Sequence, residues 1–151
     1  MNLQSYKEDF FLLVEAGFIA VNQFDEDAAL KLFKAAELLN PSNTLPLLGK
    51  GYMHLCKLEL KAAIPLFEKI LAQEAENAMA KTLLGLALSF NPTEVGKGEK
   101  TLEEAFKMAD DKMGQGLATT ALEFVRKFVK KSPSPAQTAS GNNPSQKNLS
   151  R

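Results

Sequence analysis

The sequence predicts an all-α protein in which helical hairpins stack into a solenoid. Apolar residues recur with the 3.6-residue period of an amphipathic helix along most of the first 131 positions, and no segment reads as a convincing strand. Similar segments also follow one another at a spacing of 34 residues. A fixed period of this length indicates repeated supersecondary units that bury their apolar faces against their neighbours.

The repeat is clearest between Asp25 and Pro41. Small and large apolar side chains hold fixed offsets there, and the offsets return one period later: Ala29, Phe33 and Ala36, then Ala63, Phe67 and Ile70. Three glycines, Gly17, Gly51 and Gly85, keep the same 34-residue spacing. This pattern is typical of the tetratricopeptide repeat, a pair of antiparallel helices. We expect Gly17 to lie opposite Ala29 and Gly51 opposite Ala63, with Phe33 and Phe67 between successive repeats.

Each element of the first two repeats has its own start or stop signal. The first helix, about 6–22, has one broad apolar side. Asp25 caps a second helix, 25–39, which ends before Pro41 because a residue preceding proline disfavours the helical conformation. Residues 42–44 offer the next cap, before helices at 47–57 and 59–73. Pro65 lies inside the latter, where proline removes a hydrogen bond and favours a kink.

The third repeat is irregular. A helix over 77–90 ends at Asn91-Pro92, and the next helix keeps the spacing only if its loop holds one extra residue. We therefore divide the chain into a repeat domain, residues 1–131, and a tail, 132–151, whose Ser, Pro, Asn and Gln content predicts disorder. The repeats span about 10–43, 44–77 and 78–111, and a capping helix spans about 112–131, because stacked repeats leave their end face open.

Composition excludes several classes of function. The 18 basic and 18 acidic residues balance, and no clustered basic face indicates nucleic-acid binding. The longest apolar run is too short to span a membrane, and the N-terminus does not read as a secretory signal. One cysteine allows no internal disulfide and favours a reducing cytoplasm. His54 and Cys56 lack further metal ligands, and no nucleophile has an oriented base, so we expect no metal, no cofactor and no enzymatic activity.

The first helix of each repeat is expected to line a concave groove. The groove positions are the second, fifth, ninth, twelfth and thirteenth of each repeat; most are apolar and none is charged. The same helices carry a second apolar set directed at the core, so the groove set needs a further partner, and an amphipathic helix fits it. The candidate binding residues are Phe11, Val14, Phe18, Val21, Leu45, Leu48, Tyr52, Leu55, Met79, Leu86 and Phe90.

A three-repeat chain with an apolar groove resembles the tetratricopeptide chaperones of bacterial type III secretion. The opening FFLLVEAGFIAVNQFDEDAALKLF, followed by three repeats and a final helix, is most similar to the branch that holds the needle subunit. The resemblance covers about residues 6–131. It implies a chaperone of the bacterial cytoplasm that binds a needle-subunit helix, with a second small co-chaperone, and prevents premature polymerisation. A chaperone of translocator proteins, a generic interaction scaffold and a homodimer that covers its own groove remain alternatives.

Overall fold

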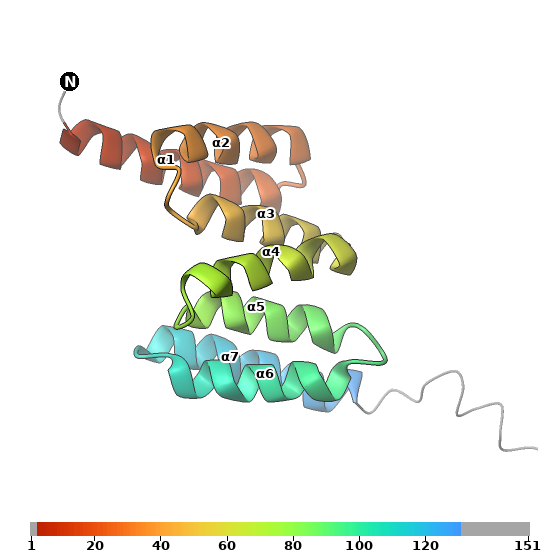
Figure 1. The fold of residues 1–151 in the computed structure, drawn as a ribbon. Coiled ribbons are helices and arrows are strands. Elements are labelled where there is room, and N and C mark those ends of the chain that lie inside the picture. Colours follow the sequence, from red (N-terminus) through yellow and green to blue (C-terminus); the bar gives the residue numbers. More distant parts are fainter. Residues whose placement is uncertain (1–2, 131–151) are drawn as a thin grey trace, which may run out of the picture.

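The chain folds as a succession of α-helices. The computed structural model describes residues 3–130, with side chains from Ser5 onward, and within this range every regular element is helical, which confirms the all-α class (Figure 1). The predicted tail, 132–151, and the last residue of the predicted capping helix lie outside it. The elements are α1 (Leu3–Asn22), α2 (Glu26–Leu39), α3 (Leu45–Cys56), α4 (Leu60–Gln73), α5 (Ala78–Ser89), α6 (Val95–Met108), α7 (Lys112–Phe124) and a π-helical turn, η1 (Val125–Val129).

The capping side chains explain where several helices begin. The Asp25 carboxylate accepts a hydrogen bond from the Ala28 N–H at 3.0 Å, as predicted, and Asn77 caps α5 in the same way. Thr44 precedes α3 but makes no capping bond; its hydroxyl instead donates to Glu74 at 2.8 Å. Pro65 lies inside α4, and that helix nevertheless runs unbroken from Leu60 to Gln73.

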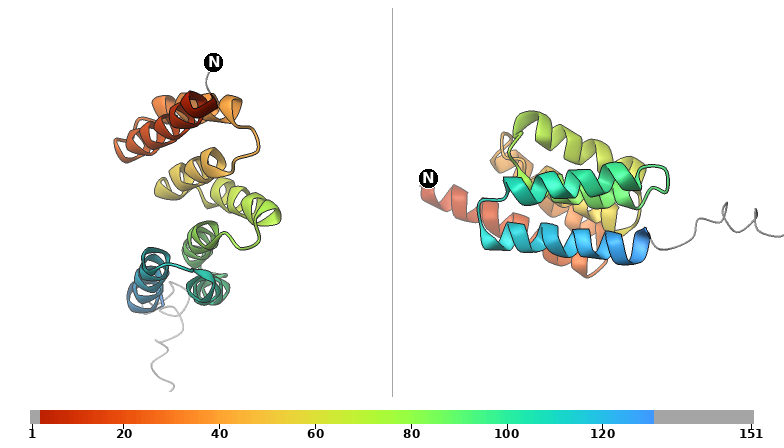
Figure 2. Two further views of the ribbon diagram at one scale, coloured as in Figure 1. Left: turned by 90° about the vertical axis from the view of Figure 1, so that its left-hand side faces the viewer. Right: turned by 90° about the horizontal axis from the view of Figure 1, so that it is seen from below.

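The helices pack in chain order and form two layers. Each helix contacts the next, and the chain reverses direction between them, so that α1–α2, α3–α4 and α5–α6 are hairpins that follow one another along the stack (Figures 1 and 2). The odd-numbered helices α1, α3, α5 and α7 also contact one another in sequence. Among the described residues, α2, α4 and α6 make no such contacts with each other. Successive hairpins therefore lie closer together on the side of the odd-numbered helices than on the side of the even-numbered ones.

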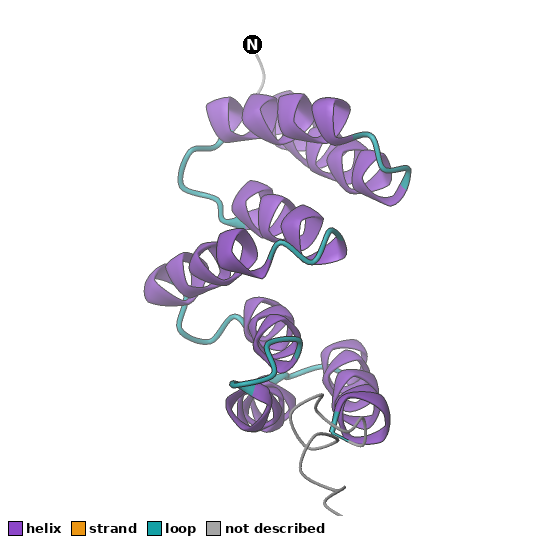
Figure 3. Ribbon diagram, turned by 90° about the vertical axis from the view of Figure 1, so that its right-hand side faces the viewer, coloured by secondary structure: helices purple, strands orange, loops and turns teal. Residues whose placement is uncertain are grey.

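The even-numbered helices keep the register that the sequence indicates. Helix α4 begins 34 residues after α2, and α6 begins 35 residues after α4, which is the one-residue insertion expected before it. The buried side chains follow the same offsets: Ala29, Phe33 and Ala36 in α2; Ala63, Phe67 and Ile70 in α4; Gly98, Leu102 and Ala105 in α6. Short loops join the helices (Figure 3).

One glycine in each of α1, α3 and α5 faces the large residue of the next helix: Gly17 faces Phe33, Gly51 faces Phe67 and Gly85 faces Leu102. A Cβ placed on Gly17 would lie 2.5 Å from the Phe33 ring, and one on Gly51 would lie 2.6 Å from the Phe67 ring. The atoms nearest to these two glycines are thus the phenylalanine rings, and the expected pairing with Ala29 and Ala63 stays a prediction. Gly49 of α3 also touches the Phe33 ring, so this ring fills the space between the first two hairpins, as predicted.

Two bulky residues occupy a backbone conformation that favours glycine. Phe24 (φ 60°) and Leu58 (φ 58°) end α1 and α3, 34 residues apart. In each turn the N–H of this residue bonds to the carbonyl three positions back and the following N–H bonds to the carbonyl five positions back, the Schellman pattern. A left-handed conformation costs a residue with a side chain about 1–2 kcal/mol. Both hairpins therefore carry local strain that a glycine would relieve.

Candidate functional site: an apolar groove

The odd-numbered helices enclose an apolar hollow on their shared face. Its volume is about 560 Å³, and four helices or their first flanking residues contribute to its wall. None of the described lining residues is charged. They are Phe18 and Asn22 from α1; Leu45, Leu48 and Tyr52 from α3; Asn77, Met79 and Leu83 from α5; and Leu117 from α7.

Aromatic contacts hold the α1–α3 side of the hollow. The Phe18 ring packs edge-on against the buried Phe33 ring, with ring centroids 5.5 Å apart, and lies 5.9 Å from the Tyr52 ring. The Tyr52 hydroxyl donates to the Asn22 side-chain oxygen at 3.3 Å. Burial raises the pKa of Tyr52 above its ordinary value, and the neighbouring Cys56 thiol adds to this rise. The phenol therefore stays neutral and remains a directional polar group in an apolar wall.

The α5 side is fixed by hydrogen bonds at the start of that helix. Asn77 accepts from the Ala80 N–H at 2.9 Å and donates to Glu74 at 2.7 Å, and Glu74 also accepts from Thr44. These bonds join the first turns of α3 and α5 through the end of α4. Met79, which follows Asn77, is 40% exposed and projects from this fixed turn. The wall is thus assembled before any partner arrives.

The predicted groove residues divide into three groups by burial. Phe11 and Met79 are exposed, and Phe18, Leu45, Tyr52, Leu86 and Phe90 are partly buried. The remaining four, Val14, Val21, Leu48 and Leu55, are buried, at no more than 7% exposure. The expectation of an open stripe is corrected for these four, because they pack into the clusters between neighbouring helices. Leu48 alone among the four also lines the hollow.

The C-terminal end of the predicted groove is covered by the last helix. Leu86 packs against the cluster that contains Leu122 and Val125, and the Phe90 ring lies 6.1 Å from the Phe124 ring. Phe124 in turn lies 5.3 Å from Phe128. These side chains of α7 and η1 therefore occupy part of the surface that the sequence assigned to a partner.

Sequence reasoning missed three lining residues. Asn77 and Leu83 were not among the predicted positions, and Leu117 belongs to the helix that was expected only to cap the stack. The signal for α7 was present in the sequence, because Met113 continues the series Phe11, Leu45 and Met79 at the same 34-residue spacing. Along α7 and η1, exposed Met113, Leu117, Phe124 and Phe128 form a second apolar stripe beside the buried one.

The described part of the chain contains no cluster of three or more His, Cys, Asp or Glu side chains that could hold a metal ion. His54 Nδ1 lies 2.6 Å from the Glu59 carboxylate, and Cys56 is exposed.

No helix between residues 3 and 130 is long and apolar enough to cross a membrane. No protein-family model matches the sequence, and a comparison with curated proteins finds no match.

Proposed function

We propose that this chain is a tetratricopeptide-type chaperone that binds an amphipathic helix in the groove formed by α1, α3, α5 and α7. The observation that carries the proposal is the uncharged hollow across all four helices. Contiguous exposed apolar surface on a protein marks an interaction site, because its hydration is unfavourable. The repeat assignment is supported by the 34- and 35-residue offsets between equivalent helices and by the glycine–phenylalanine contacts.

The wall chemistry selects a partner with an apolar face. A charged guest side chain would lose its hydration in the hollow and meet no opposite charge among the described lining residues. Side chains at i, i+3 and i+4 of a guest helix form the apolar stripe that this helix-in-groove mode recognises. The amide of Asn22 and the hydroxyl of Tyr52 add polar contacts at one side of the stripe.

The resemblance to needle-subunit chaperones supplies the partner in this proposal. Needle subunits polymerise through apolar helical surfaces, so a cytoplasmic protein that covers one such surface prevents early assembly. A guest that buries about 800 Å² of apolar area gains roughly 20 kcal/mol before the costs of association and ordering, which offset most of it. We propose a holding role in the bacterial cytoplasm, with a second small co-chaperone, and no catalytic step.

A pair of charge substitutions tests this proposal. Met79→Asp places a carboxylate in the wall of the hollow, whereas Leu38→Asp introduces the same charge on α2, where Leu38 is 76% exposed and does not line it. Binding of a fluorescent peptide with the amphipathic C-terminal helix of a needle-type subunit is measured by anisotropy. We expect Met79→Asp to weaken binding at least about tenfold, or 1.4 kcal/mol, and Leu38→Asp to change it little.

Circular dichroism of both variants establishes that they are folded. If the Met79→Asp protein is folded and captures the peptide as tightly as the unmodified chain, the groove is not the binding site. If the unmodified chain and Leu38→Asp bind an unrelated apolar helix but not the needle-type peptide, and Met79→Asp binds neither, the groove proposal survives and the needle assignment is wrong.

A further inference from the structure

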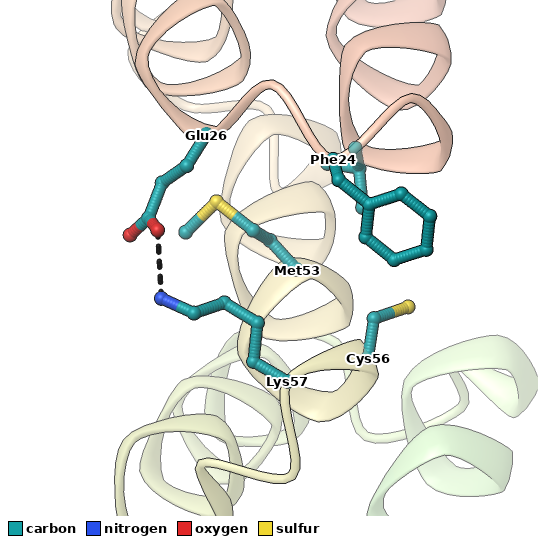
Figure 4. Close-up of a pocket in the computed structure, with 6 residues that line it drawn as sticks. Phe24, Glu26, Met53, Cys56 and Lys57 are labelled. Carbon is teal, nitrogen blue, oxygen red and sulfur yellow. Dashed lines mark hydrogen bonds and ion pairs between the residues drawn. The ribbon is translucent and has the colours of Figure 1, made fainter.

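A second apolar feature lies at the edge where α1 turns into α2, apart from the groove. Phe24 is 87% exposed although its ring is large and its backbone is in the left-handed region. Next to it is a hollow of about 220 Å³ lined by Val21, Phe24, Glu26, Met53, Cys56 and Lys57 (Figure 4). An unfavourable backbone and an exposed ring coincide at this one position, and such a combination points to a functional constraint.

The surface here presents an exposed aromatic ring directly beside an apolar hollow. Phe24 forms one wall, Cys56 lies on the same side, and Met53 lies between them and the charged rim (Figure 4). A symmetric dimer requires a patch that is complementary to itself, because the same residues face each other across the two-fold axis. An exposed aromatic ring beside an apolar hollow meets this requirement, since each copy offers a ring and each accepts one.

The charges at the rim also suit two identical copies. Lys57 Nζ lies 2.7 Å from the Glu26 carboxylate and 2.9 Å from that of Glu59, so the rim carries both signs. Two such rims related by a two-fold axis can pair opposite charges and need not repel. Leu58 follows Lys57 and is 62% exposed, but it lines a separate hollow with Leu60 and Asn91.

We propose that the α1–α2 turn is a homodimer interface in which Phe24 of each copy enters the hollow beside Met53 and Cys56 of the other. This interface leaves the groove open, because the two hollows share no lining residue. A dimer would therefore present two grooves, each able to take its own partner. The proposal stands independently of what the groove binds.

Sedimentation velocity of the full chain over a range of concentrations tests the interface. We expect a reversible dimer of the 16.5 kDa chain whose dissociation constant rises at least about tenfold in Phe24→Gly, which removes two buried rings per dimer. Glycine suits the backbone of this position, so the variant should remain folded. Met79→Asp is the matched control, because it alters the groove alone, and it should leave the dimer intact.

The single cysteine gives a second measurement at the interface itself. Cys56 is exposed in one chain and lines the hollow that the partner's ring would cover. Its reaction with a small maleimide should slow in proportion to the dimer fraction as protein concentration rises, and should be independent of concentration in Phe24→Gly. A chain that is monomeric at all concentrations overturns the proposal. So does a dimer that Met79→Asp disrupts and Phe24→Gly does not, since that dimer would form through the groove.

Discussion

Helices α5 and α6 approach each other closely at Gly98, and this approach predicts a large effect of one methyl group. A Cβ on Gly98 of α6 would lie 2.6 Å from the Ser89 backbone nitrogen and 2.7 Å from the Gly85 carbonyl oxygen of α5, and it would also touch the Ser89 hydroxyl. Real Cβ contacts below 3.0 Å are essentially absent from proteins, so something must shift. The atoms in the way are largely backbone, which cannot rotate aside as a side chain can.

The expected free-energy change combines two opposed effects. Alanine favours a helix interior over glycine by about 0.8–1.0 kcal/mol. Separating α5 from α6 is an overpacking cost of about 1–3 kcal/mol, sometimes more, and it also disturbs the buried Leu102 that packs on Gly85. Because the clash is largely with backbone, the overpacking cost lies in the upper part of that range, about 2–3 kcal/mol, and we expect Gly98→Ala to lower the free energy of unfolding by about 1–2 kcal/mol net. At Gly116 of α7 an added Cβ meets nothing within 4 Å, so Gly116→Ala should raise it by about 0.8–1.0 kcal/mol.

Urea unfolding, followed by circular dichroism in the helical band at about 222 nm, measures the free energy of unfolding of both variants on one scale. The two substitutions are chemically identical and differ only in what the new methyl group meets, so their difference isolates the packing term. If Gly98→Ala is as stable as Gly116→Ala, the close approach of α5 and α6 is wrong. A change in the urea slope as well as the midpoint would show either that the variant exposes a different amount of surface on unfolding or that it no longer unfolds as one cooperative unit.

Two further predictions concern the turn strain and one ion-pair cluster. Leu58→Gly should raise the free energy of unfolding, measured with urea, by about 0.5–1 kcal/mol. The reason is that relief of the left-handed backbone exceeds the entropy that glycine adds to the unfolded state. A lower free energy of unfolding would show that the leucine side chain packs on its neighbours. The Arg126 guanidinium, together with Lys130, lowers the pKa of Glu99 in the folded protein. The Glu99 carboxylate therefore stabilises the fold fully at pH values above its ordinary pKa. This stabilisation is lost as the pH falls through the lowered folded-state pKa. Glu99→Gln should therefore cost about 1 kcal/mol near neutral pH and progressively less as the pH falls through the lowered folded-state pKa of Glu99, and a cost that does not change with pH would contradict the ionic contribution.

Much of the fold followed from spacing in the sequence. The 34-residue period placed Phe33 and Phe67 correctly at the helix contacts, and the extra residue before α6 was visible as an offset in Gly98 and Leu102. Such features are predictable because a repeat contacts only its neighbours, so the same local constraint recurs at each period. The left-handed Phe24 was not predicted, because nothing in the local sequence marks it as the position where glycine would usually stand.

The groove was predicted less completely than the fold. A helical period identifies which side of a helix is apolar, but an inner helix of a stack packs against its hairpin partner and against the next inner helix. Val14 and Leu55 therefore have the periodicity of groove residues and the burial of core residues. Leu117 was missed for the opposite reason, since the helix that carries it was expected only to cap the stack and its apolar side was attributed to that role.

The division between core and groove determines which substitutions can test binding. Leu48 lines the hollow and is only 7% exposed, so a charged residue there would disturb the packing between α3 and α5 as well as any guest contact. Met79 lines the same hollow at 40% exposure, and its backbone is held by the Asn77 cap independently of its side chain. Loss of binding in a Leu48 variant would be ambiguous, whereas loss in a folded Met79 variant reports on the groove. The most exposed lining residues, and not the most central ones, separate recognition from stability.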